Sequence, residues 1–440
     1  MVAELVAEVR VEEPEPSAVE RWNPLARIIF RYGFVVLGVG MAGVLVFHSL
    51  LRSLQVPEST VETMSKWTSL HPLTEWVGEH VFDTKVQWLF AGSSDTQANW
   101  ISTFTLLLVA VPVTVVWSLL DRGRPNYARL YGWFRLTLRF ALVSALLMYG
   151  MIKVLPSQMA FSLERLVEPF GDMSPMAVLW SSTAASEPYE IALGTAEIVA
   201  ALLLILPITA GLGAVLSVIV CLQVFLLNLT YDVPVKLLAL QLLVYALVLA
   251  APDIIRIVRA LTVGAVSPRT PEPLVTTPRA RRILVWGQVI AGVWLLITTV
   301  MEGHDAWQLY GNGRPHSPLY GIWNVTEQTS NGQPVAAADR FRRLIFDLPQ
   351  AVTAQRPDDS LQDLPAVIDT ERGTVTITKD LDHVWKLATL NYQQPQPDQL
   401  ILDGQFSGRP VRLVLSRVDL DSFRQLSRGF HWTQPAPYLR

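Results

Sequence analysis

The stretch that decides the fold runs from residue 188 to residue 251 and reads PYEIALGTAEIVAALLLILPITAGLGAVLSVIVCLQVFLLNLTYDVPVKLLALQLLVYALVLAA. Its apolar runs are 188–208, 210–229 and 234–251. A helix needs about 20 predominantly apolar residues to cross a bilayer, and each run is close to that length. The joins between the runs are short, so neighbouring helices must be antiparallel. The stretch therefore predicts a compact array of membrane-spanning helices.

The overall composition indicates a membrane protein with a smaller water-soluble part. Of the 440 residues, 51% are hydrophobic and 17% are charged, whereas soluble domains contain about 25% charged residues. The mean hydropathy is +0.33. The net charge of -3 gives no indication of nucleic-acid binding. The single cysteine, Cys221, lies in an apolar run, so we expect a buried small side chain and no disulfide within the chain.

Further apolar runs bring the predicted number of spans to seven. They are 29–51, 101–120, 134–155 and 281–301. Arginine is concentrated in the N-terminal flank and in the connections between spans two and three and between spans six and seven. Because basic connections remain in the cytoplasm, the N-terminus is predicted to be cytoplasmic, and everything after the seventh span is predicted to lie outside.

The chain is thus predicted to have three regions. Residues 1–25 are acidic and contain prolines, which favours a disordered cytoplasmic tail. Residues 26–302 form the α-helical membrane bundle. Within it, 52–99 is an outer loop whose tryptophans and leucines recur at helical spacing, which indicates interfacial helices. The proline-rich stretch 264–279 is predicted to be a flexible cytoplasmic linker.

A second outer connection, 156–187, precedes the fourth span. Several of its apolar residues are expected to lie at the membrane interface. They are Phe161, Leu163, Leu166, Val167 and Phe170. Phe170-Gly171-Asp172 predicts a turn within this connection.

Residues 303–440 are predicted to form an extracytoplasmic antiparallel β domain. Apolar and polar residues alternate in segments that are separated by Asn331-Gly332, Arg372-Gly373 and Ser407-Gly408, which are turn sequences. The predicted strands are 321–327, 342–347, 374–379, 385–392, 399–406 and 411–417. This many strands should close into a barrel or a sandwich. Residues 423–432 are expected to form a helix or a lid.

Charged residues inside or at the ends of the apolar runs predict a polar pocket. Lys153, Glu190, Glu197, Asp232 and Lys236 fall at one depth once the spans are threaded. A Lys or Asp at the centre of a spanning helix costs about 2.5–3.5 kcal/mol, so such residues are functional candidates. Because these residues come from different helices, we expect them to meet in the outer leaflet.

Lys153 and Glu197 are the candidate catalytic residues. Tyr149 and Lys153 are four residues apart and share a helix face. A desolvated lysine there could act as a base or bind a ligand oxygen, and the alternative is a lysine that extends to the interface. Glu197 could pair with Lys153 or relay protons, and the alternative is a structural ion pair. Glu190 lies two turns nearer the helix start, where the helix dipole favours a structural role.

The candidate substrate-binding residues are Tyr149, Glu190 and the residues that frame the outer turn between spans five and six. These are Asn228, Tyr231, Asp232 and Lys236. Asp232 could cap the sixth span, and Asp232 and Lys236 could pair. No histidine pair has metal-ligand spacing, and His71 and His80 have the surroundings of loop residues. No metal site and no covalent cofactor are therefore predicted.

Residues 133–260 resemble the DoxX family of small bacterial membrane proteins. The resemblance rests on Tyr149-Gly-Met-Ile-Lys153, on Leu163-Glu-Arg-Leu166 with Phe170-Gly171, and on Gly194-Thr-Ala-Glu197-Ile198. It implies a multi-pass protein of the bacterial inner membrane and membrane redox chemistry, including thiosulfate:quinone oxidoreduction and thiol-stress complexes. The Tyr149, Lys153 and Leu155 pattern is also similar to the membrane core of vitamin K-dependent carboxylases, in which a lysine acts as the base on a quinol.

The opening of the β domain, Gly321-Ile322-Trp323, resembles the Gly-x-Trp opening of lipocalin-like barrels. Three functions follow as hypotheses. The first is a quinone-linked redox subunit that uses a diffusible quinone and a redox partner protein. The second is a non-enzymatic, membrane-anchored carrier or scaffold that binds an amphiphile through the β domain. The third is a quinol-dependent, carboxylase-like enzyme.

Overall fold

The computed structural model describes residues 21–89, 94–264, 274–379 and 385–438. Most of the predicted N-terminal tail and most of the predicted linker at 264–279 lie outside these residues. The chain forms two compact units. Unit 1 contains the described residues up to Ala145, Ala200–Phe225 and Pro234–Leu295, and unit 2 contains Leu146–Val199, Leu226–Val233 and the described residues from Leu296 onward.

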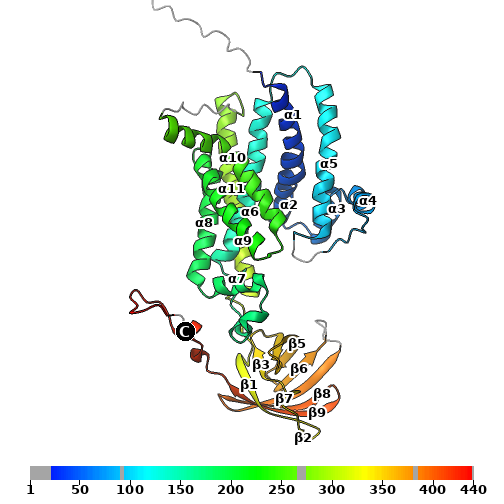
Figure 1. Cartoon of the computed structure of the whole chain (residues 1–440), viewed down its shortest axis with the longest axis vertical. Coiled ribbons are helices and arrows are strands. Elements are labelled where there is room, and N and C mark those ends of the chain that lie inside the picture. Colours follow the sequence, from blue (N-terminus) through cyan, green and yellow to red (C-terminus); the bar gives the residue numbers. More distant parts are fainter. Residues whose placement is uncertain (1–20, 90–93, 265–273, 380–384, 439–440) are drawn as a thin grey trace, which may run out of the picture. The chain divides into compact units, whose positions relative to one another are not determined.

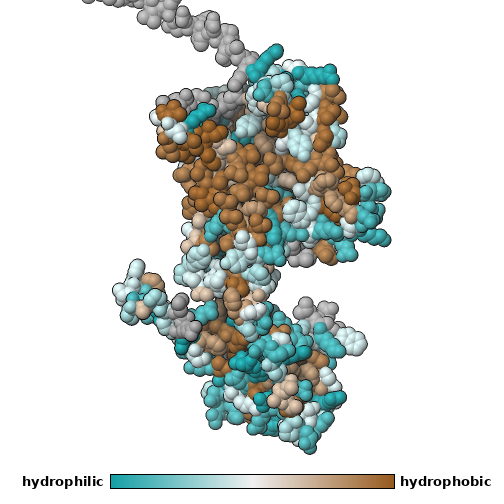
Figure 2. Space-filling view, viewed as in Figure 1, coloured by the Kyte–Doolittle hydropathy of each residue, from teal (hydrophilic) through white to brown (hydrophobic). Residues whose placement is uncertain are grey.

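Seven helices in the described part of the chain are long and apolar enough to cross a membrane, as predicted (Figure 1). The first is continuous through α1 (Pro24–Gly33), η1 (Phe34–Gly43) and α2 (Val44–Ser53). The others are α5 (Gln97–Leu120), α6 (Ala128–Val154), α8 (Glu187–Ile205), α9 (Ala210–Thr230), α10 (Lys236–Val263) and α11 (Pro278–Leu309). Figure 2 shows that hydrophobic residues cover most of the visible face of these helices. The chain is a multi-pass membrane protein by this criterion.

The first spanning helix changes its winding in the middle. It begins conventionally, because the Asn23 side chain accepts the N–H of Ala26 at 2.6 Å and Pro24 occupies the first turn. Phe34–Gly43 is then wound as a π-helix. A Cβ at Gly40 would lie 2.6 Å from the Leu106 side chain, so glycine allows η1 and α5 to approach closely.

Arg135 of α6 compensates for a proline inside α10. Pro252 has no N–H, so the carbonyl of Val248, four residues earlier, lacks its usual helical partner. The Arg135 guanidinium donates to the Val248 oxygen at 3.3 Å and to the Leu249 oxygen at 2.8 Å. An arginine expected from its sequence position to be a cytoplasmic charge therefore also completes a helix.

The two helices predicted within residues 52–99 are present. They are α3 (Glu58–Thr68) and α4 (His71–Val81), with Leu70 between them in the left-handed conformation (φ 52°). His71 and His80 therefore lie in a helix, and their assignment to a loop was wrong. The second connection contains η2 (Leu163–Leu166), η3 (Phe170–Asp172) and α7 (Pro175–Ala184).

The C-terminal region is a closed antiparallel barrel of eight strands, which confirms the predicted barrel-like domain. The strands are β1 (Gly321–Ser330), β3 (Arg343–Phe346), β4 (Ala351–Gln355), β5 (Leu361–Asp369), β6 (Thr374–Thr378), β7 (Lys386–Gln396), β8 (Gln399–Phe406) and β9 (Arg409–Arg417). The short β2 (Gln333–Pro334) extends the hairpin of β1. Each strand pairs with its neighbour in this order, and β1 pairs with β9, with Trp323 opposite Arg417.

The predicted turns are present because their residues tolerate positive φ. Asn331 and Gly332 have φ of 52° and 75°, and Ser407 and Gly408 have φ of 50° and 77°. Such pairs form the tight turns that match the twist of two antiparallel strands. The prediction omitted β4 and β5. The segment 423–432, expected to be a helix or a lid, is helical only at α12 (Arg424–Ser427).

Apolar side chains from all eight strands fill the barrel. Trp323 and Phe346 are among the largest of these fully buried residues. The Trp323 indole donates to the Leu319 oxygen at 3.0 Å, and the Arg417 guanidinium lies over its ring at 5.9 Å. The Gly-x-Trp opening thus closes one end of a packed interior.

A second small core joins the barrel to the connection before α7. Leu163 packs with Ile322 and Ile345, and Phe161, Leu166 and Val167 pack against this cluster. The prediction that these four residues of the connection lie at the membrane interface was therefore wrong. Their apolar pattern reflects a protein contact, whereas Phe170 remains 75% exposed.

Candidate functional site

Two glycines bring α6 and α8 into close contact. A Cβ at Gly194 would lie 2.5 Å from the Gly150 oxygen, and a Cβ at Gly150 would lie 2.9 Å from the Gly194 oxygen. Small residues at such a crossing allow two spanning helices to come into backbone contact. Lys153 follows Gly150 by three residues, and Glu197 follows Gly194 by three, so the crossing brings the two charges together.

Lys153 and Glu197 form a buried ion pair in unit 2. The Lys153 Nζ lies 3.0 Å from Glu197 Oε1 and 3.1 Å from Glu197 Oε2. It also donates to the backbone oxygen of Tyr149 at 3.1 Å. The exposed fractions of Lys153 and Glu197 are 6% and 3%. Three oxygens therefore match the three donors of the ammonium group.

Glu190 is also buried, with an exposed fraction of 1%. One of its carboxylate oxygens accepts the backbone N–H of Met159 at 3.3 Å. The neighbouring Glu187 accepts from the side chain of Asn312 at 3.1 Å. The acidic residues at the start of α8 thus attach it to the connection after α6 and to the loop that follows α11. This is a structural contribution.

The turn between α9 and α10 is organised differently from the prediction. The first free N–H groups of α10, those of Lys236 and Leu237, both donate to the Asp95 carboxylate at 2.8 Å. The Lys236 Nζ lies 3.5 Å from the same carboxylate. Asp95 therefore satisfies this helix start, where Val235 occupies the N-cap position without a side-chain cap, and the proposed capping role of Asp232 was wrong.

Asp232 instead belongs to the end of α9. It has a φ of 52°, a left-handed conformation that aspartate tolerates better than most residues. The N–H of Val233 then bonds back to the Asn228 oxygen at 3.0 Å, as at many helix ends. Asn228 is buried and Tyr231 is half-buried. Of the predicted pocket residues, the distances place Lys153 with Tyr149 and Glu197, and Lys236 with Asp95.

A cavity of about 710 Å³ lies in unit 2, in the connection between α6 and α8. Residues 157–185 supply most of its wall, and Tyr310 and Gln425 complete it. The wall combines apolar side chains such as Met159, Met176 and Trp180 with serines and the pair Glu164 and Arg165. A volume of this size is typical of sites for small organic molecules.

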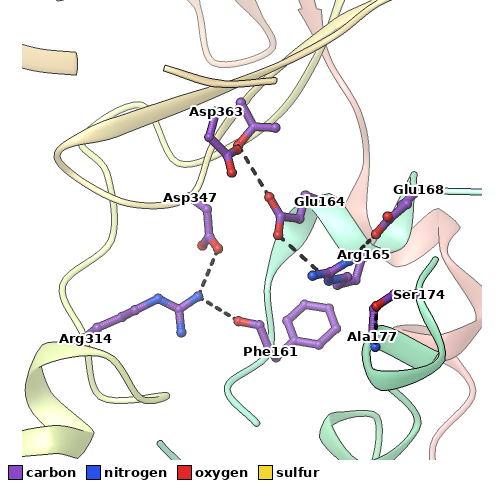
Figure 3. A network of polar contacts seen from close by, with 10 residues as sticks. Phe161, Glu164, Arg165, Glu168, Ser174, Ala177, Arg314, Asp347 and Asp363 are labelled. Carbon is purple, nitrogen blue, oxygen red and sulfur yellow. Dashed lines mark hydrogen bonds and ion pairs between the residues drawn. The ribbon is translucent and has the colours of Figure 1, made fainter. Parts of the chain in front are cut away.

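A polar network holds the charged side of this cavity (Figure 3). Arg165 is ion-paired with Glu164 at 3.8 Å and makes a close ion pair with Glu168. On the barrel, the Thr353 hydroxyl lies 2.6 Å from Asp363 and 3.5 Å from Glu164. The network thus joins η2 to β4 and β5.

A second ion pair anchors the same connection to the loop before β1. The Arg314 guanidinium donates to Asp347 and to the backbone oxygen of Phe161, at 2.9 and 2.6 Å (Figure 3). The side chain of Arg314 is only 7% exposed. The Phe161 backbone is thereby held beside the cavity by a largely desolvated contact.

Burial raises the pKa of the Glu164 carboxyl, and the charge of Asp363 raises it further, while Arg165 opposes the shift. A protonated Glu164 can direct its proton at the Thr353 oxygen, whose own hydrogen is used by Asp363. The cavity therefore has one fixed cation and one carboxyl whose charge depends on pH. These groups could orient a polar headgroup while Met176 and Trp180 contact an apolar tail.

Comparison with known proteins identifies one relationship. No family model matches the chain, and no solved structure matches it. Over 126 residues it is 31% identical to the uncharacterized protein YwoB of Bacillus subtilis (strain 168), and the alignment covers 27% of this chain and 75% of YwoB. The chain belongs to the YwoB family. Because YwoB is itself uncharacterized, membership of the YwoB family supplies no activity.

In this member of the YwoB family, sequence reasoning found Lys153 and Glu197 but missed Asp95, Glu164 and Arg314. Asp95 directly precedes Thr96, which caps α5, so its local pattern is that of any helix start. Glu164 and Arg314 bind partners 189 and 33 residues away in sequence. Their contacts depend on the closed barrel, so the spacing of residues along the sequence does not indicate them.

Proposed function

We propose that this protein is a multi-pass membrane protein that binds an amphiphilic small molecule in the cavity formed mainly by residues 157–185. The single observation that supports this function is the cavity of about 710 Å³, in which apolar residues surround a charged pair. An amphiphile needs both an apolar wall and a polar end. Membrane lipids and an isoprenoid quinone are the amphiphiles that such a site would meet in a bilayer.

The packed barrel argues for this location over the interior of the β domain. The buried side chains of the barrel core are at most 8% exposed, and Trp323, Phe346 and Leu400 are at most 1% exposed. In a small eight-stranded barrel, side chains can fill the interior completely. In this proposal the barrel supports the cavity through Thr353 and Asp347, and the amphiphile binds outside it.

The ion pair of Lys153 and Glu197 has a structural role in this proposal. The ammonium hydrogens of Lys153 are donated to the Glu197 carboxylate and to the Tyr149 backbone oxygen. A base that attacks a quinol would need a free lone pair, so the redox and carboxylase hypotheses require this pair to open. A quinone-linked reaction with a redox partner protein therefore ranks behind binding alone.

We also propose a bacterial inner-membrane location, with the N-terminus in the cytoplasm and the barrel outside. Arginine clusters between α5 and α6 and between α10 and α11 support this orientation, because basic connections are retained inside. The resemblance to the DoxX family supports the bacterial membrane as the location.

The test is lipid extraction and mass spectrometry of the full chain purified in mild detergent. Wild-type protein should retain an amphiphile in a fixed molar ratio. Ala177→Trp places an indole in the cavity wall and should reduce that ratio at least fivefold. Val199→Trp, on a 42% exposed position of α8, is the matched control and should leave the ratio unchanged. Equal retention by both variants, or no retained molecule in the wild type, would exclude the proposal.

A further inference from the structure

A second cavity, of about 230 Å³, lies in unit 1 and has no part in the function proposed above. Four elements of this unit form it: the first spanning helix, the end of α3, α5 and α10. Its lining residues include Met41, His48, Ser69, Ser102 and Gln241. No Asp, Glu, Lys or Arg is among the residues that line it, and His48 contributes an imidazole. The composition excludes a site built for a strongly charged ligand.

The cavity lies where the first helix leaves its π-helical stretch. Gly40 and Met41 belong to η1, and Val44, Leu45 and His48 belong to α2 directly after it. A π-helix is a rare winding that is frequently found at functional sites. A Cβ at Gly43 would lie 2.9 Å from the Gly38 oxygen, so glycine at this position accommodates the winding.

His48 is the polar group that lacks a partner. Its Nε2 is buried and makes no hydrogen bond within the described residues. A buried donor or acceptor without a partner costs about 1–3 kcal/mol. Gln241, on α10, is partly buried and is a second polar side chain of the lining. Polar groups from two different helices therefore line one cavity.

The hydroxyl groups around His48 already donate their hydrogens to backbone oxygens. Ser102 donates to the Ser69 oxygen at 3.1 Å, Ser69 donates to the Ser65 oxygen at 2.6 Å, and Thr103 donates to the Asn99 oxygen at 2.9 Å. Their oxygens remain available as acceptors. A ligand in this cavity would thus meet the imidazole and the amide of Gln241 as its donors or acceptors.

We propose that this cavity binds the headgroup of a neutral lipid that has carbonyl or hydroxyl oxygens. A neutral imidazole and an amide hydrogen-bond such oxygens without a charge on either side. The volume is below the usual range for whole drug-sized ligands, so it fits a headgroup, and the tail would follow apolar residues such as Val44 and Leu238. A quinone ring and a diacylglycerol headgroup share this chemistry.

The experiment measures the thermal stability of the purified full chain with and without two probes, decyl-benzoquinone and dioctanoylglycerol. At least one probe should raise the Tm of the wild type. The probe that does so shows whether the cavity binds a quinone ring or a diacylglycerol headgroup. His48→Phe and Gln241→Leu should each weaken the apparent Kd about tenfold. Without a probe, the Tm of His48→Phe should equal or exceed that of the wild type, because an unpartnered polar group has been removed.

Two controls make the test specific. His80→Phe changes an exposed histidine of α4 that stacks on Trp76, and it should leave probe binding unchanged. Ala177→Trp, in the unit 2 cavity, should also leave the probe shift unchanged, so failure here is separable from failure of the function proposed above. No shift by either probe, a shift that His48→Phe retains, or a lower probe-free Tm in His48→Phe would overturn the proposal.

Discussion

The ammonium group of Lys153 contacts three oxygens, two from Glu197 and one from Tyr149. Burying an ion pair removes two hydration shells, and the mutual attraction compensates only when the geometry is this complete. The pair therefore contributes little to stability compared with an apolar replacement of both residues, but removal of one partner leaves a buried charge.

Lys153→Met should thus lower the stability of the full chain by about 3–5 kcal/mol, because Glu197 would remain charged without its partner. Lys153→Met combined with Glu197→Leu should recover most of that loss. Tm values of the two variants in detergent measure the difference. If Lys153 instead acts on a ligand, the single variant would fold as well as the wild type and lose only the bound molecule.

Part of this site could be predicted from the sequence alone. Lys153 and Glu197 lie at one depth of adjacent spans, so their pairing was one of the expected alternatives. The cap of α10 was not accessible in the same way, because Asp95 binds Lys236 and Leu237 from 141 and 142 residues away. Asp232, an acidic residue close to the start of α10 in the sequence, was wrongly predicted to be its cap.

At the scale of elements, the crossing of α6 and α8 depends on contact between backbones. Gly194→Ala places a Cβ 2.5 Å from the Gly150 oxygen, and neither backbone can move independently of its helix. The helices must separate, which should lower stability by about 1–3 kcal/mol or more. Gly287→Ala in α11, where a Cβ has no neighbour within 4 Å, is the matched control. Equal Tm values for both variants would contradict the close crossing.

The attachment of η2 to the barrel should depend on pH through Glu164. Its pKa is raised in the folded protein, so the native state binds the proton more tightly than the unfolded chain does. This contribution to stability is fully present below the unfolded pKa of about 4.3, and it is lost as the pH rises through the higher folded-state pKa. Hydrogen-exchange protection of residues 163–168 should therefore fall with increasing pH.

Glu164→Gln is the control for that measurement, since glutamine keeps a neutral side chain at every pH. Its protection in 163–168, corrected for intrinsic exchange, should not change over the same interval. A wild-type protection factor that stays constant or rises with pH would show that Glu164 does not govern the attachment.

The type of each element, helix or strand, could be predicted from the sequence more readily than the way a helix is wound. The turns at Asn331-Gly332 and Ser407-Gly408 require residues that accept positive φ, and this requirement is visible in the sequence. The π-helix at 34–43 was not visible, because a uniformly apolar run fits either winding. The segments β4 and β5 were missed because 351–355 is short and β5 contains Pro365.

At the scale of the whole molecule, the count of seven spans followed from hydrophobic length alone, since the bilayer sets that length. The orientation is a separate question and depends on charge. The connection between α5 and α6 has Arg122 and Arg124, whereas the connection between α9 and α10 has no basic residue before Lys236. Five of the described spans, an odd number, lie between the α5–α6 connection and the barrel. If this basic connection stays inside, the barrel must therefore lie outside.

This orientation predicts opposite accessibility for two introduced cysteines. Gly123→Cys lies at an exposed turn between α5 and α6, and Ser360→Cys lies at an exposed turn between β4 and β5. In intact cells, a membrane-impermeant maleimide should label the cysteine at 360 and should label the one at 123 only after permeabilisation. The wild-type chain is the blank, because its single cysteine, Cys221, is buried in α9. Labelling at 123 in intact cells would invert the topology and would move the barrel, with the cavity that it supports, to the cytoplasmic side.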